Sequence, residues 1–97
     1  MRVISKKVLR EFWTKHPDAA EPLRAWFAEV ERALWAGPSD IKNRYASASI
    51  LSGDRVVFNI GGNKYRLVVV VKFVSGYVYV RFVGTHAEYD RINAEEI

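Results

Sequence analysis

Hydrophobic side chains recur at helical spacing in the first third of the chain. Between residues 19 and 35 one buried helix face is indicated by Leu23, Trp26, Phe27, Val30 and Leu34. A shorter run covers residues 6–15, where Ser5 is placed to cap the helix. Pro17 interrupts the pattern between the two runs, and Gly37-Pro38 ends the second. The sequence therefore predicts two helices, over residues 6–15 and 19–35.

The rest of the chain has the character of β-strands. The segments "RVVFNI", "KYRLVVVVKF" and "YVYVRFV" are rich in valine and aromatic residues, and the hairpin signals "GGN" and "SG" separate them. "MRVI" is typical of a short strand, and "SDIKNRY" indicates one helical turn capped by Ser39. We therefore expect a single α+β domain over residues 1–97. It has a short N-terminal strand, two helices, and an antiparallel β-meander with the helices packed on one face.

Two-residue hairpin loops would give the meander one hydrophobic face and one basic face, because directly opposed residues share a face. The face expected to receive the helices comprises Val56, Phe58, Ile60, Tyr65, Leu67, Val69, Val71, Phe73, Val78, Val80 and Phe82. The opposite face comprises Arg55, Asn59, Lys64, Arg66, Lys72, Tyr77, Tyr79 and Arg81. This register pairs Val70 with Arg81 and Thr85 with Arg66, so His86 would lie at the rim of the basic face. A three-residue loop or a bulge would shift the parity of one strand.

Charge is distributed unevenly along the chain. The net charge is +4, but residues 41–87 carry seven Lys and Arg against one acid, Asp54, a local balance of +6. Residues 88–97 carry one Arg against four acids, a balance of −3. A basic region of this kind suggests a polyanionic partner such as nucleic acid, because binding of phosphates releases counterions.

Several residues near the predicted basic face suit metal-independent RNA cleavage. That reaction needs a base for the 2′-hydroxyl, positive charge for the transition state, and an acid for the leaving oxygen. A histidine such as His86 can serve as base or acid, and Lys64, Arg66 and Arg81 supply positive charge. Tyr89 could stack on a base or donate a hydrogen bond. The same pattern is also typical of a solvated strand surface without any ligand.

Other chemistries have weaker support in the sequence. His86, Glu88 and Asp90 could supply three metal ligands, but no other histidine is near and the surroundings are basic. "GGNK" lacks the strand–loop–helix context of a phosphate loop. The chain has no cysteine, which removes thiolate and disulfide chemistry. We therefore expect neither a metal nor a cofactor.

The segments "IKNRYASASIL", "RVVFNIGGNKYRLVV" and "RFVGTHAEYDRI", in that order, carry a resemblance to a known family. Together with the N-terminal "ISKKVLREFWTKHPDAAEPLRAWF", they resemble the HigB-type toxins of bacterial toxin–antitoxin pairs, which belong to the RelE-like group. The resemblance covers essentially the whole chain. It implies a RelE-like fold and a cytoplasmic endoribonuclease that cleaves mRNA, commonly on translating ribosomes. It also implies a cognate antitoxin that neutralises the toxin.

The resemblance also implies roles for individual residues. His86 would be the general base or acid, Arg66 and Arg81 would stabilise the transition state, and Lys64 would contact phosphate or assist proton transfer. Tyr89 would position a base, and Asp90 would orient His86 or cap the terminus. Further RNA contacts are expected from Arg44, Arg55, Asn59 and Lys72.

Two other functions fit the same basic face. A non-catalytic RNA- or ribosome-binding module would bind with the same salt dependence and not cleave. A protein-interaction domain would dock an acidic partner segment there. The N-terminus has no apolar signal region, and no segment approaches the roughly 18 apolar residues of a membrane span, so we expect a cytoplasmic protein without a membrane partner. Operator DNA would be bound only through a helix-turn-helix antitoxin.

Overall fold

The computed structural model describes every residue from Met1 to Ile97. The elements are, in chain order, β1 (Arg2–Ile4), α1 (Lys6–Lys15), the 3-10 turn η1 (Pro17–Ala19), α2 (Ala20–Arg32), α3 (Pro38–Arg44), β2 (Ser49–Ile50), β3 (Arg55–Ile60), β4 (Tyr65–Lys72), β5 (Tyr77–Thr85) and α4 (His86–Tyr89). The α+β class and the first helix are confirmed. The second helix is shorter than predicted, because the 3-10 turn precedes it and Ala33 takes an extended conformation.

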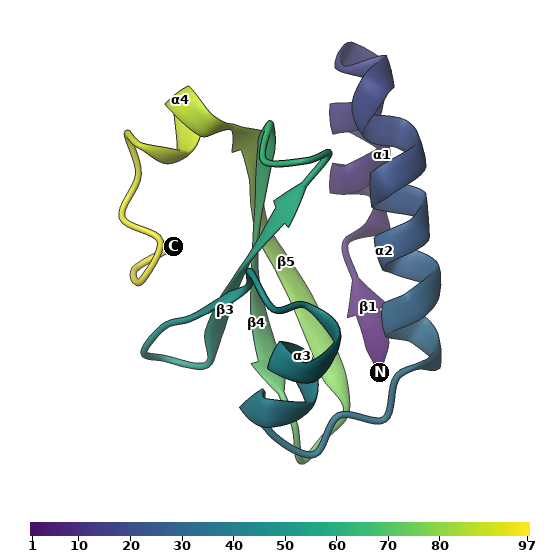
Figure 1. Ribbon diagram of the computed structural model, residues 1–97, viewed down its shortest axis with the longest axis vertical. Helices are drawn as coiled ribbons and strands as arrows, with labels where there is room; N and C mark the ends of the chain where they lie inside the picture. The colour runs from purple at the N-terminus through teal and green to yellow at the C-terminus, as the bar shows by residue number, and fades with distance from the viewer.

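One five-stranded sheet, in the order β1-β5-β4-β3-β2, forms the centre of the molecule. Strands β2 to β5 are antiparallel, as the predicted meander requires, and β1 pairs with β5 in parallel. Helices α1 and α2 lie side by side along one side of the sheet, and α4 with the C-terminal segment lies on the other (Figure 1). We call the side that faces α1 and α2 the inner face, and the opposite side the outer face.

The inner face carries the main hydrophobic core. Phe58 lies at its aromatic centre, with the rings of Trp26, Trp35 and Tyr45 at centroid distances of 5.4, 6.4 and 5.1 Å. The predicted inner-face residues Val56, Phe58, Ile60, Tyr65, Leu67, Val69, Val71, Phe73, Val78 and Val80 all belong to this core or pack against it. Leu34, predicted to be buried, is 93% exposed because the helix ends before it.

The helix starts differ from the predicted caps. Ser5 precedes α1 with a positive φ of 80° and makes no capping hydrogen bond through its side chain. Gly37, and not Ser39, is the residue before α3, and Pro38 occupies the first turn. The carboxylate of Asp40 instead accepts a hydrogen bond of 2.8 Å from the backbone N–H of Ala36. That bond closes the loop between α2 and α3.

The register of the meander differs from the prediction at two places. Both hairpin loops contain four residues, which preserves the parity of β3 and β4, so Val70 pairs with Tyr79 and Lys72 with Tyr77. An irregularity then inserts Arg81 as an extra residue, because Val69 pairs with Val80 while Val68 pairs with Phe82. The inserted residue moves Phe82 from the predicted inner face to the outer face.

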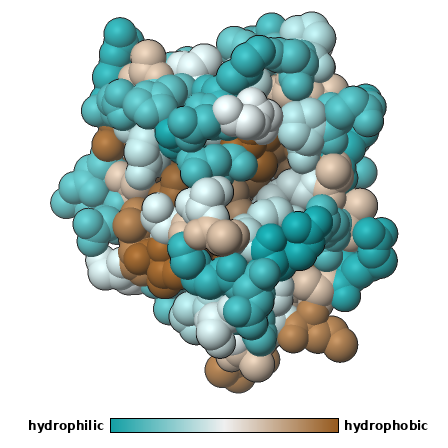
Figure 2. Space-filling view, in the orientation of Figure 1, coloured by the Kyte–Doolittle hydropathy of each residue, from teal (hydrophilic) through white to brown (hydrophobic).

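The outer face has a buried hydrophobic centre in addition to its basic residues, which the prediction of an open basic face did not include. Val57 and Val68 are 4% and 0% exposed, and Ala94 of the C-terminal segment packs against them. Four partly buried side chains complete this outer cluster: Leu51, Phe82, Tyr89 and Ile97. Figure 2 shows a mostly hydrophilic surface in which hydrophobic atoms gather where the C-terminal segment meets the sheet. None of the helices has the length and apolar character that a membrane span requires.

Candidate active site

Arg66 is the one buried charged residue of the protein, 8% exposed on the outer face of β4. Its Nη1 donates to the backbone carbonyls of Asn63 at 2.9 Å and Tyr65 at 3.3 Å. No carboxylate forms an ion pair with it. Its other N–H groups have no protein partner, and they reach the surface because they are not among the buried unpartnered atoms. The guanidinium therefore offers an uncompensated positive charge with free donors.

Gly84 brings α4 close to this arginine. It pairs with Arg66 in the β4–β5 register. A Cβ atom at position 84 would lie 2.5 Å from Cζ of Phe82 and 2.9 Å from Oε1 of Glu88. A side chain at this position would therefore displace the ring of Phe82 and the carboxylate of Glu88, and so disturb the start of α4. The close approach places the first residues of α4 on the outer face beside Arg66.

A reciprocal pair of hydrogen bonds begins α4. The hydroxyl of Thr85 accepts from the N–H of Glu88 at 3.1 Å, and the carboxylate of Glu88 accepts from the N–H of Thr85 at 2.8 Å. The backbone bond to Thr85 lowers the pKa of Glu88 below its ordinary value of 4.5. The carboxylate of Glu88 is thus engaged in the cap of α4. No three His, Asp or Glu side chains lie close enough together to hold a metal ion.

His86 is the first residue of α4 and is oriented from two sides. Its Nδ1 lies 3.1 Å from Oδ2 of Asp90, with the imidazole side chain 54% exposed. Its backbone N–H donates to the carbonyl of Lys64 at 3.3 Å, which ties α4 to the β3–β4 loop. The contact is an ion pair when the imidazole is protonated, and Nε2 has no hydrogen-bond partner within the protein. This arrangement suits proton transfer at Nε2.

The other predicted contacts on the outer face have partners within the protein. Nε of Arg55 donates to the carbonyl of Ile97 at 2.8 Å, and the amide of Asn59 donates to the carbonyl of Ser47 at 3.3 Å. Tyr89 packs against the outer cluster. Asn59 pairs with Arg66 in the β3–β4 register, so it lies beside the guanidinium. The structure therefore brings Asn59, Arg66, His86, Tyr89 and Asp90 to one end of the outer face.

Lys64 points away from this group, contrary to the predicted basic face. It lies in the four-residue loop, and its Nζ is 3.0 Å from Oδ2 of Asp18 near the helices. The hydroxyl of Tyr65 donates to the other oxygen of the same carboxylate. This hydrogen bond, followed by that from Lys64, lowers the pKa of Asp18 below 3.8, and the same carboxylate raises the pKa of Tyr65 above 10.0. No motif marks this cluster, because Asp18 is 46 residues from Lys64 and 47 residues from Tyr65 in the sequence.

The remaining cations are dispersed. Arg81 is exposed in the bulge, about three strand positions from Gly84, and does not pair with Val70 as predicted. Lys72 forms an ion pair of 2.8 Å with Asp54 at the far end of β4. Neither Arg81 nor Lys72 thus belongs to the group at the Arg66 end of the outer face.

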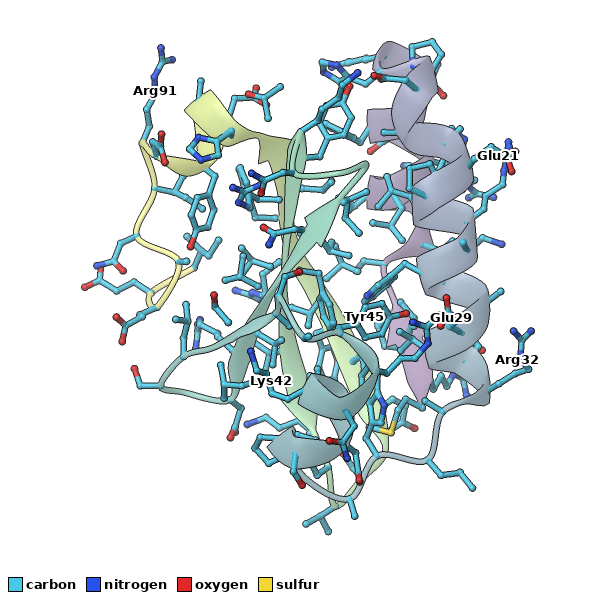
Figure 3. All side chains as sticks on the ribbon, in the orientation of Figure 1. Glu21, Glu29, Arg32, Lys42, Tyr45 and Arg91 are labelled. Atoms are coloured by element: carbon cyan, nitrogen blue, oxygen red, sulfur yellow. The ribbon has the colours of Figure 1, made fainter.

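Arg44 lies in a separate cavity between α2 and α3. It forms an ion pair with Glu29 and its guanidinium carbon lies 5.1 Å from the ring centroid of Tyr45. The cavity has a volume of about 310 Å³ and is lined by Glu29, Arg32, Ala33, Trp35, Arg44 and Tyr45. Burial, together with the charge of Glu29, raises the pKa of Tyr45 to about 12. Figure 3 shows Tyr45 and Glu29 between these helices, across the molecule from Arg91 beyond α4.

Comparison with known proteins connects this geometry to a family. The profile of the HigB toxin family, described as the RelE-like toxic component of a toxin–antitoxin system, matches residues 19–92. The chain belongs to the HigB toxin family. Two curated relatives agree: the "mRNA interferase toxin HigB" of Escherichia coli K12 is 32% identical over 96 residues, covering 97% of this chain and 92% of the relative. The "mRNA interferase HigB" of Escherichia coli O6:H1 strain CFT073 is 24% identical over 94 residues, covering 95% and 91%.

The match to the HigB family contains the whole candidate site. Residues 19–92 include β4, β5 and α4, and therefore Arg66, His86 and Asp90. Helix α1 and most of the C-terminal segment that packs on the outer face lie outside this range. The resemblance seen in the sequence is thus confirmed at the level of the family and the fold. The roles of the individual residues stay predictions.

Proposed function

We propose that this HigB-family toxin is an endoribonuclease that cleaves mRNA, with the scissile phosphate bound at the Arg66 end of the outer face. Similarity to proteins named mRNA interferase supports the reaction class. The observation that carries the placement is Arg66 itself. A nearly buried guanidinium without a carboxylate partner is costly unless an anion completes it, and a phosphate matches its planar donors.

The proposed reaction is an attack of the 2′-hydroxyl on the adjacent phosphate. Nε2 of His86 removes the 2′-hydroxyl proton as the new P–O bond forms, and the P–O bond to the 5′-oxygen breaks. The leaving 5′-oxygen takes a proton from solvent water and the imidazolium returns its proton to solvent, so the products are a 2′,3′-cyclic phosphate and a 5′-hydroxyl. Asp90 lies 3.1 Å from Nδ1 of the imidazole and would stabilise the ring once it is charged. Arg66 stabilises the extra negative charge of the transition state.

The other predicted residues take supporting roles in this proposal. Tyr89, held in the outer cluster, would position a base next to the cleaved bond, and Asn59 lies beside Arg66 to contact the strand. Arg81 and Arg55 would contact phosphates further along the face. Lys64 takes part only if it leaves Asp18, and Arg44 and Lys72 only if they leave their carboxylate partners.

We further propose that cleavage takes place on translating ribosomes and that a cognate helix-turn-helix antitoxin inhibits it. The antitoxin would either cover the face around Arg66 and His86 or make the complex too large for the ribosome. Chemical modification of His86 separates these two modes. An inhibited complex in which His86 remains as reactive as in the free toxin would exclude covering.

A non-catalytic RNA- or ribosome-binding module is the second candidate, because the same face carries uncompensated Arg66. It predicts salt-dependent binding of RNA without new 5′ ends. The oriented imidazole of His86 favours the nuclease, since binding alone does not require a histidine held by a carboxylate.

The test is primer extension on an mRNA in a translating extract. We expect new 5′ ends with the wild-type protein, and a loss of at least about a hundredfold in rate with Arg66→Ala and with His86→Ala. Arg10→Ala, an exposed arginine on α1, is the matched control and should cleave at the wild-type rate. Wild-type cleavage by both site variants would refute the assignment, and absence of any cleavage would favour the binding module.

A further inference from the structure

Two tyrosines of β5 lie on the outer face, away from the Arg66 site. Tyr77 and Tyr79 alternate with Val78 and Val80, which are buried in the main core. Tyr79 is 36% exposed, and the two ring centroids are 6.0 Å apart with planes inclined by 34°. Neither hydroxyl forms a hydrogen bond within the protein. Two large aromatic rings are thus displayed side by side without a structural partner for their polar ends.

The C-terminal segment leaves these rings uncovered. It packs on Val57, Val68 and Phe82, and neither Tyr77 nor Tyr79 belongs to that outer cluster. The helices cannot reach the rings, because α1 and α2 lie on the inner face (Figure 1). The sheet order places β1 and β5 at the edge farthest from β2. This edge is therefore the open part of the outer face.

Cations surround the two rings. Arg2 of β1 pairs in register with Tyr77, and Lys72 of β4 pairs with the same residue from the other side. Arg81 follows Tyr79 two positions later and is exposed. Arg2 and Arg81 form no ion pair, and Asp54 neutralises only Lys72. The charge around the rings is thus positive. This charge favours a polyanionic partner over a protein surface that carries no negative charge.

We propose that Tyr77 and Tyr79 form a stacking platform for bases of single-stranded RNA, with Arg2 and Arg81 contacting the adjacent phosphates. This inference rests on the proposed function, since the bound strand would be the substrate that continues to Arg66. Aromatic rings next to basic side chains are the usual means of binding single strands without regard to sequence. Tyr79 pairs with Val70, four residues along β4 from Arg66, or about 13 Å at the rise of a strand, and Tyr77 pairs with Lys72 two residues further on. One strand of RNA spans both places.

The platform would act on binding and not on the chemical step. Stacking of a base on an aromatic side chain typically changes affinity by about five- to a hundredfold on alanine substitution. Loss of the platform should therefore weaken the binding of longer RNA, while a substrate too short to reach the rings is unaffected. Arg81 should contribute to the salt dependence of binding, and the tyrosines should not.

The experiment measures binding of a fluorescent single-stranded RNA by anisotropy, using a fully 2′-O-methylated strand that cannot be cleaved. The full chain is compared with Tyr77→Ala/Tyr79→Ala and with Tyr77→Phe/Tyr79→Phe. We expect at least tenfold weaker binding for the alanine pair and binding within about twofold of wild type for the phenylalanine pair. Val74→Ala, at the exposed tip of the same hairpin, is the control and should bind like wild type. Thermal unfolding verifies that each variant folds.

Crosslinking gives a second readout. RNA containing 4-thiouridine should crosslink to the tryptic peptide of residues 73–81, which holds both tyrosines and ends at Arg81. The double alanine variant should lose that crosslink. Wild-type affinity of the alanine pair, or crosslinks confined to other peptides, would overturn the platform. Unchanged RNA binding together with loss of antitoxin binding would overturn it too, and would identify this edge as a protein-docking surface.

These outcomes separate the platform from the nuclease. The probe is not a substrate, so its affinity does not depend on catalysis. A protein that cleaves mRNA and whose alanine pair binds RNA like wild type refutes the platform alone. A protein that never cleaves, but loses RNA binding when the tyrosines are removed, supports the platform and refutes the nuclease.

Discussion

The two faces of the sheet are built by different rules, although the same strands form both. On β4, Leu67 and Val69 enter the inner core and Val68 enters the outer cluster, and all three are 0% exposed. The inner face is hydrophobic throughout and is covered by two long helices. The outer face has only a small hydrophobic centre, covered by a short segment, and keeps Arg66 at one end and tyrosines at the other. Stability is therefore concentrated on one face, and candidate chemistry on the other.

The largest expected effect is on the inner face. Phe58→Ala removes the ring that contacts Trp26, Trp35 and Tyr45, and should lower the free energy of unfolding by about 3–5 kcal/mol. Urea unfolding followed by tryptophan fluorescence measures this loss. A loss below about 1 kcal/mol would show that the inner face is not the main source of stability.

Gly84→Ala should damage function more than stability. The added methyl group would meet the ring of Phe82 and the carboxylate of Glu88, and therefore displace α4 with His86. A shift of about 1 Å in a reacting group typically lowers the rate by about a hundredfold. Cleavage rate and melting temperature should be measured on the same preparation. Full activity in the variant would show that the cleavage rate does not depend on the position of α4.

Val68→Ala compares the outer cluster directly with the inner core. Its neighbour Val69 is equally buried but faces the helices, so Val69→Ala is the matched variant. We expect losses of about 1 kcal/mol for Val68→Ala and about 2 kcal/mol for Val69→Ala, because the small outer cluster can relax around the gap. Chemical denaturation of both proteins measures the difference. Equal losses would mean that the C-terminal cover is as rigid as the helix layer.

Acid should weaken both faces through two carboxylates. Asp18 binds Lys64 and Tyr65 on the helix side, and Glu88 caps α4 on the outer side, and the pKa of each is lowered in the folded protein. A lowered folded pKa gives stability that is present above the unfolded values of 3.8 and 4.5, and is lost as the pH falls through the folded pKa. The melting temperature should therefore fall between pH 5 and pH 2, and fall less in Asp18→Asn and Glu88→Gln. An unchanged pH profile in both variants would contradict these shifts.

The smallest effect is expected at Leu34, which helical periodicity placed in the core. Because it is 93% exposed beyond the end of α2, Leu34→Ala should change the free energy of unfolding by less than about 0.5 kcal/mol. Thermal unfolding provides the measurement. A loss comparable to that of a buried leucine would indicate that the helix extends to Leu34, as the periodicity predicted.

Periodicity predicted the inner face well because one rule governs it. Burial against helices selects every second residue of β3 and β4, and ten of the eleven predicted inner residues are found there. Phe82 is the exception, since nothing in "YVYVRFV" marks Arg81 as an inserted residue. The unbroken valine run of β4 is typical of strands covered on both faces, but the second face was expected to be open and basic. The packing of the C-terminal segment on the outer face was not predicted, because few hydrophobic side chains of that segment, Ala94 and Ile97, contribute to it.

The candidate site was predicted in part for a related reason. His86 and Asp90 are neighbours in sequence, and a single helical turn brings them together. Arg66 was placed on the correct face, but its burial depends on the loop carbonyl of Asn63, which sequence spacing does not reveal. Lys64 was misplaced because its partner Asp18 lies in a distant segment.

The parallel pairing of β1 with β5 also has a consequence for the order of synthesis. Val3 of β1 pairs with Val78 of β5. Strand β1 therefore leaves the ribosome long before the strand with which it pairs has been synthesised. At about 5–20 residues per second, the delay is about 4–15 s. Gly84 and His86 are made later still, at the end of the same strand. A growing chain would thus be unable to assemble this site until the residues through His86 have left the ribosome.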